Sequence, residues 1–229
     1  EVQVVNTFPT IIREPDTIFR QCQQRPDWFP SAEMRDAMLI MTRDLFRAAG
    51  FREGPISYLH SPSKRPQQQA DKFECVNLIA FGPSAFGYWN GEEWSAQCFN
   101  YCNLDDYYRR IRQNQLPLWR AGVMHNVERA RRKLIFGLAN CKTENLVELE
   151  RRFDISVDDT FGQMLNGLYE EGLIRIDKTG HGVYYTEEGL CRLEEISYFF
   201  GSDQVNQRAN QLVSPVDPYR GELLRHHYY

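Results

Sequence analysis

The segment Leu78-Ile79-Ala80-Phe81-Gly82-Pro83-Ser84-Ala85-Phe86-Gly87-Tyr88 carries the clearest structural signal in the sequence. Apolar residues from Phe73 to Phe81 predict a buried strand that runs directly into a loop of small residues. Small residues let the backbone approach a ligand closely. In α/β folds, loops that follow the strands bind ligands, so Gly82 to Gly87 is a candidate binding loop. A plain tight turn after a strand explains the same residues equally well.

Strand and helix signals alternate before this segment. Val2 to Ile12 is β-branched and predicts a strand, and Ser31 is a plausible N-cap for a helix that reaches Ala49. Phe51 to Leu59 predicts a second strand, and the polar run Lys64 to Lys72 predicts an exposed loop. The apolar positions of the helix recur at helical spacing, at Met34, Met38, Met41, Leu45 and Phe46. This order favours an α/β fold with a parallel sheet.

The second half of the chain is predicted to be mainly helical. Helices are predicted at Leu104 to Gln113, Val127 to Leu138, Thr143 or Asn145 to Phe153, Asp158 or Asp159 to Gly172, and Glu187 to Phe200. Leu116 to Gly122 is interpreted as a linker around Pro117, and Leu173 to Asp177 is predicted to pair with Val183 to Tyr185. Leu190, Leu193, Ile196 and Phe200 are expected to point inward. Three helices, a hairpin and a helix form the order of a winged-helix module.

The composition narrows the function classes. The 229 residues carry a net charge of −4 and have a pI of about 5.8, which gives no electrostatic case for nonspecific binding to nucleic acid or to an acidic membrane. The sequence has no apolar run near the ~20 residues that span a bilayer. Six scattered cysteines indicate reduced thiols and a cytoplasmic location rather than a disulfide framework.

Cys98 and Cys102 are a tempting but weak metal motif. Three thiolates at CxxxCxxC spacing would hold an iron–sulfur cluster, but the third position here is Asp105. A zinc site would need further Cys or His ligands nearby. We interpret the two thiols as packing residues and predict no metal ligand in the chain.

Four basic residues precede the winged-helix-like stretch: Arg129, Arg131, Arg132 and Lys133. As part of a DNA-binding module they would contact phosphates. The predicted third helix, however, carries four acidic residues and no Lys or Arg, so a DNA groove would repel it. Packing and solvated faces are the favoured interpretation.

Six blocks of the sequence occur in the same order as in a known family: Pro9–Thr17, Pro30–Phe51, Ile56–Pro62, Leu78–Tyr88, Trp119–Ile135 and Gly172–Gly189. Leu78–Tyr88 is the closest block and is similar to the family's strand and loop, DLIGxGxSAxGY. On these blocks the chain resembles the C-terminal portion of oxygen-independent coproporphyrinogen III oxidases and their radical SAM relatives.

The resemblance implies an α/β fold made of the C-terminal part of a partial (β/α)6 barrel and a mainly helical, winged-helix-like domain. We therefore expect barrel structure in residues 1–103, the helical domain in residues 104–201 and a peripheral tail in residues 202–229. In this family, S-adenosyl-L-methionine bound to a [4Fe–4S] cluster yields a 5′-deoxyadenosyl radical that abstracts a substrate hydrogen. The substrate of the oxidases carries a propionate side chain, and relatives transfer methyl groups or act on haem.

The same alignment suggests cofactor-binding residues. Ile56 and the loop residues Gly82, Pro83, Ser84, Ala85 and Phe86 fall in the SAM-proximal region, with Phe86 at an apolar contact position. His60 follows the same predicted strand as Ile56 and is a further candidate, although a lone His is more often structural. Arg65 to Gln69 departs from the family's substrate- and SAM-contacting stretch. The expected partner is therefore a small molecule, such as a tetrapyrrole, rather than porphyrinogen specifically.

The family's cluster-binding CxxxCxxC loop has no counterpart in this sequence, so its ligands are expected upstream of residue 1. The 229-residue chain alone is predicted to be inactive, whereas a full-length parent would be a radical SAM oxidoreductase. Two alternatives stay open: a winged-helix nucleic-acid-binding regulator, and a haem-binding or trafficking relative without radical chemistry.

Overall fold

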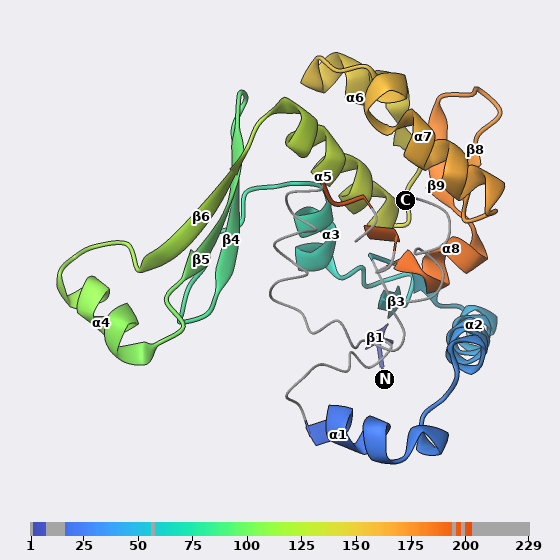
Figure 1. Ribbon diagram of the computed structural model, residues 1–229, viewed down its shortest axis with the longest axis horizontal. Coiled ribbons are helices and arrows are strands. Elements are labelled where there is room, and N and C mark those ends of the chain that lie inside the picture. Colours follow the sequence, from blue (N-terminus) through green and yellow to red (C-terminus); the bar gives the residue numbers. More distant parts are fainter. Residues whose placement is uncertain (1, 8–16, 56–57, 194–195, 198–199, 203–229) are drawn as a thin grey trace. The chain divides into compact units, whose positions relative to one another are not determined.

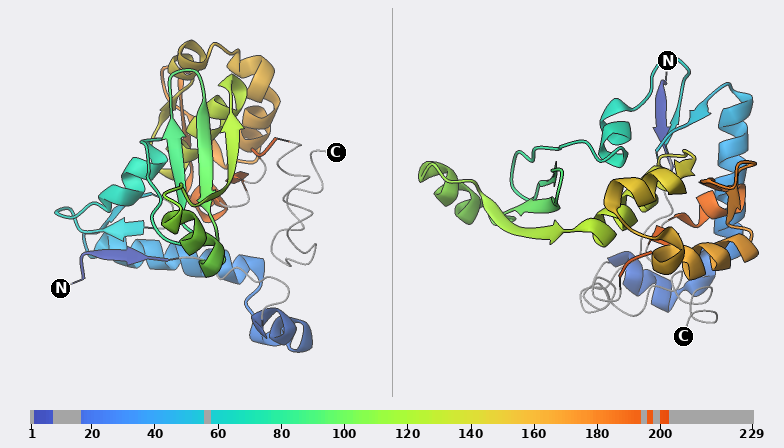
Figure 2. Two further views of the ribbon diagram at one scale, coloured as in Figure 1. Left: turned by 90° about the vertical axis from the view of Figure 1, so that its left-hand side faces the viewer. Right: turned by 90° about the horizontal axis from the view of Figure 1, so that it is seen from above.

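The computed structural model describes residues 2–7, 17–55, 58–193, 196–197 and 200–202, in the views of Figures 1 and 2. The chain forms two compact units. The first contains Glu1–Pro66, Met164–Arg175 and Tyr184–Tyr229, and the second contains Gln67–Gln163 and Ile176–Val183. The predicted tail and the block Pro9–Thr17 lie outside the described residues, except at residue 202 and at Thr17.

The first unit begins with a small antiparallel sheet of order β1-β3-β2. Its strands are β1 (Val4–Asn6), β2 (Arg52–Glu53) and β3 (Tyr58–His60). The prediction of a parallel sheet is wrong for these strands, because β3 pairs antiparallel with both neighbours. For β2 and β3 the physical reason is their short connection, since a parallel pair needs a crossover of a dozen or more residues.

Between β1 and β2 the chain forms α1 (Thr17–Gln24), a 3-10 turn (Pro26–Trp28) and α2 (Ala32–Ala48). The predicted N-cap is confirmed, because the Ser31 hydroxyl accepts a hydrogen bond from the Met34 amide at 3.2 Å. Gly50 follows α2 with a φ of +85°, the left-handed conformation that glycine favours after a helix. The apolar stripe of α2 is not core, because Met34, Met38, Met41 and Leu45 are each more than half exposed.

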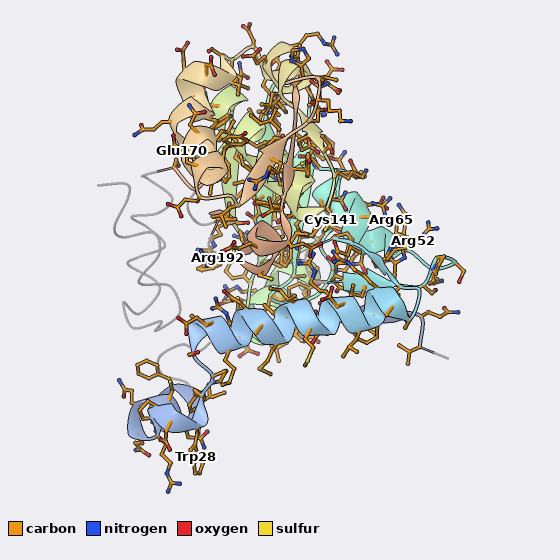
Figure 3. The ribbon with its side chains drawn as sticks, turned by 90° about the vertical axis from the view of Figure 1, so that its right-hand side faces the viewer. Trp28, Arg52, Arg65, Cys141, Glu170 and Arg192 are labelled. Atoms are coloured by element: carbon orange, nitrogen blue, oxygen red, sulfur yellow. The ribbon has the colours of Figure 1, made fainter. Side chains whose placement is uncertain are left out.

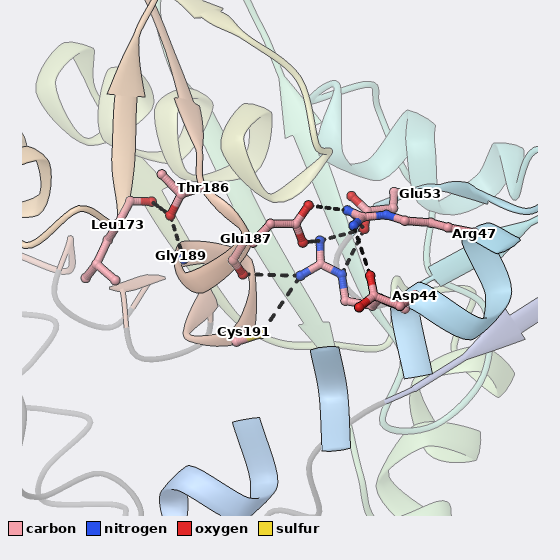
Figure 4. Close-up of polar contacts among 9 residues, drawn as sticks. Asp44, Arg47, Glu53, Leu173, Thr186, Glu187, Gly189 and Cys191 are labelled. Atoms are coloured by element: carbon pink, nitrogen blue, oxygen red, sulfur yellow. Dashed lines mark hydrogen bonds and ion pairs between the residues drawn. The ribbon is translucent and has the colours of Figure 1, made fainter. Parts of the chain in front are cut away.

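Buried charge instead attaches α2 to its neighbours. Arg43, only 8% exposed, donates to the Glu53 carboxylate of β2 and to the Glu187 backbone carbonyl (Figure 4). Arg47 bonds both Glu53 and the Glu187 carboxylate. Figure 3 labels Arg192, whose Nε lies 3.8 Å from the Asp36 carboxylate of α2. We call Arg43, Arg47, Glu53 and Glu187 the arginine clamp.

The second unit contains an antiparallel sheet of order β4-β5-β6, with strands Phe86–Asn90, Ser95–Asn100 and Leu118–Met124. Helix α4 (Leu104–Arg112) connects β5 to β6 and lies at one end of this sheet (Figures 1 and 2). Three predictions are wrong here. The linker predicted at Leu116 to Gly122 is largely β6. The strand predicted at Phe73 to Phe81 is an extended segment with one bridge. The exposed loop predicted at Lys64 to Lys72 instead contains most of α3 (Gln67–Phe73).

The extended segment forms a single antiparallel bridge between Leu78 and Tyr88. Ile79 and Phe81 are 77% and 85% exposed, and in the described residues the bridge at Leu78 is the only strand-type pairing of this apolar run. Strand formation depends on a partner, which the local sequence does not supply. The same limit explains the missed β6, whose pairing with β5 joins residues that are far apart in the sequence.

The remaining elements are α5 (Asn126–Ala139), β7 (Glu144–Asn145), α6 (Leu146–Phe153), α7 (Val157–Glu170), β8 (Ile174–Ile176), β9 (Gly182–Tyr185) and α8 (Glu187–Cys191). The predicted helices before the hairpin are confirmed to within a few residues, and β8 lies beside β9 as expected. The last predicted helix is described as α8 only as far as Cys191, although Leu193, Ile196 and Phe200 are buried as predicted. Leu190 is only partly buried.

Candidate functional site

The candidate loop, Gly82 to Phe86, connects the Leu78 bridge to β4 and is braced by one buried side chain. The Asn100 amide nitrogen donates to the carbonyl oxygens of Gly82 at 3.0 Å and Ala80 at 3.3 Å. Its backbone amide donates to the Ala85 carbonyl at 2.9 Å. Asn100 is only 2% exposed. Because three hydrogen bonds from one buried residue reach both ends of the loop, the loop conformation is specified by β5.

The loop uses its own backbone donors internally. The Gly82 amide donates to the Tyr107 hydroxyl at 3.2 Å, and the Ser84 amide donates to the Tyr101 carbonyl at 3.0 Å. The Ala85 amide donates to the Gly82 carbonyl at 3.4 Å. Successive free amides are what make a backbone nest for anions. With these three engaged, the loop offers a ligand small side chains rather than an anion cradle.

Two conformational requirements explain the glycines of this loop. Gly82 has a φ of +96°, and its missing Cβ would meet nothing within 4 Å, so backbone conformation is the constraint. At Gly87 the constraint is space, because a Cβ would lie 2.4 Å from the Leu78 carbonyl oxygen. The close approach of Leu78 to β4 thus needs glycine at position 87. Between them, Phe86 is 39% exposed and is the ring of the loop that faces solvent.

Aromatic rings and two cations gather beside Phe86. Phe86 packs edge-on against Tyr88, and Tyr88 packs edge-on against Phe136 of α5, each with ring centroids 5.9 Å apart. The Lys72 ammonium lies 5.0 Å from the Phe86 ring centre, and the Arg132 guanidinium carbon lies 4.0 Å from that of Tyr88. These distances are within the range of cation–π attraction. We call Lys72, Phe73, Phe86, Tyr88, Arg132 and Phe136 the aromatic–cation cluster.

The charges of this cluster are poorly compensated. Burial lowers the pKa of Lys72, and the positive charge of Arg132 lowers it further. Burial also lowers the pKa of Arg132. Arg132 is 9% exposed and donates through Nη1 to the Asn90 side chain at 2.9 Å, while its Nε and Nη2 are buried and have no hydrogen-bond partner in the described part of the chain.

The fold that carries this loop and cluster is found in a solved enzyme. The chain superimposes on coproporphyrinogen III oxidase (HemN) from Escherichia coli, described as a radical SAM enzyme, with a TM-score of 0.59 and 19% sequence identity. The chain shares the fold of this enzyme. The match covers 76% of this chain and 42% of the enzyme, so the chain spans less than half the length of that solved structure. No family model and no curated protein sequence matches the chain.

The sequence resemblance to the coproporphyrinogen oxidase family is therefore confirmed at the level of the fold. Of the other cofactor-binding candidates, the structure describes only His60. Ile56 lies outside the described residues. His60 is buried in β3, in the first unit, where its Nδ1 donates to the Ser61 carbonyl at 2.8 Å, whereas the loop belongs to the second unit. A shared site for His60 and the loop stays a prediction.

The described residues do not fit a [4Fe–4S] cluster. They contain no group of three His, Cys, Asp or Glu side chains that is able to hold a metal ion. Cys98 lies within β5, opposite Gly87 on one side and Ala121 on the other, and Cys102 is exposed beyond the strand. Asp105 lies in the first turn of α4, where its amide donates to the Asn103 side chain. No step of the chemistry is therefore assigned to a cluster held by these residues.

The four basic residues of α5 make contacts within the second unit. Arg129 donates to the Gly91 carbonyl at 2.7 Å, and Arg131 donates to Glu128 at 3.3 Å. Lys133 donates to Glu144 at 3.2 Å, and Arg132 belongs to the aromatic–cation cluster. These contacts support the packing interpretation over phosphate binding. In the described residues, no helix combines the length and the apolar character needed to cross a membrane.

The sequence pattern does not single out Lys72, and it predicts packing for Arg132 without indicating its aromatic partners. The polar run that predicts an exposed loop includes Lys72, whereas this residue lies in the last turn of α3 beside Phe86. Arg132 belonged to a basic run of four residues, and nothing in that run distinguishes the side chain that stacks on Tyr88. Arg132 and Phe136 are four residues apart in α5 and therefore share one face of the helix. This spacing is the one local signal of their contact.

Proposed function

We propose that the chain is the C-terminal portion of a radical SAM oxidoreductase that acts on a tetrapyrrole or a related small molecule. The observation that carries the proposal is a rigid, small-residue loop, Gly82 to Phe86, in a chain that shares its fold with a radical SAM coproporphyrinogen III oxidase. Residues 1–103 would complete a barrel and residues 104–201 would form a helical lid. The cluster ligands would come from outside this chain.

The residues of this chain would bind and orient rather than react. Asn100 fixes the loop, and Gly82 allows the backbone to face a ligand without a side chain in the way. Phe86 offers an apolar, partly exposed ring, suited to contact with an adenine or a tetrapyrrole plane. S-adenosyl-L-methionine and a cluster held by other residues would supply the radical chemistry. The loop and its neighbours would hold the ligand and exclude water.

The test uses the intact polypeptide that carries this chain, reconstituted anaerobically with iron and sulfide. Formation of 5′-deoxyadenosine from S-adenosyl-L-methionine on reduction is expected. Phe86→Ala should reduce the rate of 5′-deoxyadenosine formation while leaving the fold intact. Trp94→Ala, which removes another partly exposed ring, should leave that rate unchanged.

Two results would contradict this proposal. Absence of 5′-deoxyadenosine together with a Soret shift on haemin titration would favour a tetrapyrrole-binding relative without radical chemistry. A salt-dependent gel shift with duplex DNA would favour a winged-helix regulator.

A further inference from the structure

Lys72 and Arg132 place two positive charges in the aromatic–cation cluster without a negative partner. Neither makes an ion pair with a carboxylate in the described part of the chain. The charge that acts most on Lys72 is that of Arg132, and the polar groups that act on Arg132 are Cys75 and Tyr88. Uncompensated cations in a partly buried setting are costly unless something anionic joins them. The cluster is therefore electrostatically incomplete as it stands.

The adjacent loop needs a cation if its ligand is an anion. Its amides at Gly82, Ser84 and Ala85 are already donors within the protein, so the backbone does not compete for a carboxylate. The Lys72 ammonium lies 5.0 Å from the Phe86 ring centre. Phe86 is the exposed ring of the loop, and Lys72 is half-buried beside it. A ligand that lies on Phe86 would therefore meet Lys72 at its edge.

We propose that the Lys72 ammonium binds a carboxylate of the ligand that occupies the Gly82–Phe86 loop, with Arg132 as a second positive charge behind it. This inference rests on the proposed function for the role of the loop. Lys72 makes the contact, because the unpartnered nitrogens of Arg132 are sealed from solvent. Arg132 acts as a positioning residue through Tyr88, which it covers at 4.0 Å and which packs against Phe86.

The carboxylate has two possible sources, the methionyl group of S-adenosyl-L-methionine and a propionate of a tetrapyrrole. Binding to the intact, cluster-loaded polypeptide separates them. Calorimetry would compare S-adenosyl-L-methionine with its decarboxylated analogue, and fluorescence would follow coproporphyrin III. Each titration would be repeated on Lys72→Met, on Lys72→Arg, which keeps the charge, and on Lys178→Met, which removes an exposed lysine of the second unit.

Lys72→Met is expected to weaken one of the two ligands by about tenfold to a hundredfold, the range for a charge-assisted hydrogen bond. Lys72→Arg should recover most of that loss, and Lys178→Met should cause none. If S-adenosyl-L-methionine is the ligand affected, its decarboxylated analogue should bind Lys72→Met and the wild type equally. If coproporphyrin III is affected instead, the carboxylate is a propionate.

Tight binding of both ligands to wild type and to Lys72→Met alike would overturn this inference and leave the proposed function standing. Failure of the wild type to bind either ligand would overturn both. A loss that Lys72→Arg does not recover would also count against the inference, because it would point to packing of the lysine stem rather than to charge.

Discussion

Two regions of the molecule each bury an arginine, but within the described residues only one of them pairs it with carboxylates. In the first unit, the arginine clamp surrounds the guanidinium of Arg43 with the Glu53 carboxylate and with oxygen atoms of Glu187. In the second unit, Arg132 is equally buried but stacks on Tyr88 and leaves two nitrogens without a partner. A buried charge without a partner costs stability, and removing one member of a buried ion pair creates such a charge. The clamp is therefore structural, and the aromatic–cation cluster is the better candidate for function.

The largest expected effect comes from breaking the clamp. Arg43→Ala removes the centre of the clamp and leaves Glu53 with Arg47 alone, so the free energy of unfolding should fall by about 3 kcal/mol. Urea unfolding of the 229-residue chain measures this change. Arg20→Ala, at an exposed position of α1, is the matched control. A loss below about 1 kcal/mol would show that the clamp is a surface network of little consequence.

A smaller loss is expected where the loop of the second unit depends on backbone space. Gly87→Ala would force a Cβ to within 2.4 Å of the Leu78 carbonyl, and the displacement should cost about 2 kcal/mol. Hydrogen exchange at the Leu78 amide, which donates to the Tyr88 carbonyl, should accelerate with it. Gly122→Ala in β6 is the control, since its Cβ would have nothing within 4 Å. Equal exchange rates at the Leu78 amide in both variants would contradict a clash between a Cβ at position 87 and the Leu78 carbonyl.

Replacing the buried arginine of the second unit should do far less harm than replacing that of the first. Arg132→Met keeps an apolar stem against Tyr88 and Phe136 and removes an uncompensated charge, so the free energy of unfolding should change by less than about 1 kcal/mol. The same urea titration applied to Arg43→Met gives the direct comparison. If the two variants lose equal stability, the distinction between the clamp and the cluster fails.

The smallest effect is a pH dependence at Lys72. Burial lowers the pKa of this lysine, so the folded state binds fewer protons than the unfolded state between the lowered pKa and the ordinary value of about 10.4. Below that window the charged lysine therefore lowers the free energy of unfolding of the wild type, and this destabilisation disappears as the pH rises through the window. Lys72→Met should be slightly more stable than the wild type near neutral pH, and the difference should shrink toward pH 10. A stability difference between Lys72→Met and the wild type that grows with pH would contradict this prediction.

Several features were predictable because their causes are local. The Ser31 cap, the glycine after α2 and helices α4 to α7 follow from capping residues and helical periodicity within a few turns. The loop after Phe81 was also marked by its own small residues. That this loop is a ligand site stays a prediction, based on its small residues and on the family resemblance, and the structure adds the brace from Asn100.

By itself, the sequence determined helices α2 and α4 to α7, the hairpin of β8 and β9, and the position of the candidate loop. Only the tertiary structure decided that Phe73 ends a helix, that residues 118 to 124 form a strand, and that the apolar stripe of α2 is exposed. It also decided which of four neighbouring basic residues lies on Tyr88 without a carboxylate partner. The reason is that helices close their hydrogen bonds within four residues, whereas strand pairing and charge compensation depend on groups far along the chain.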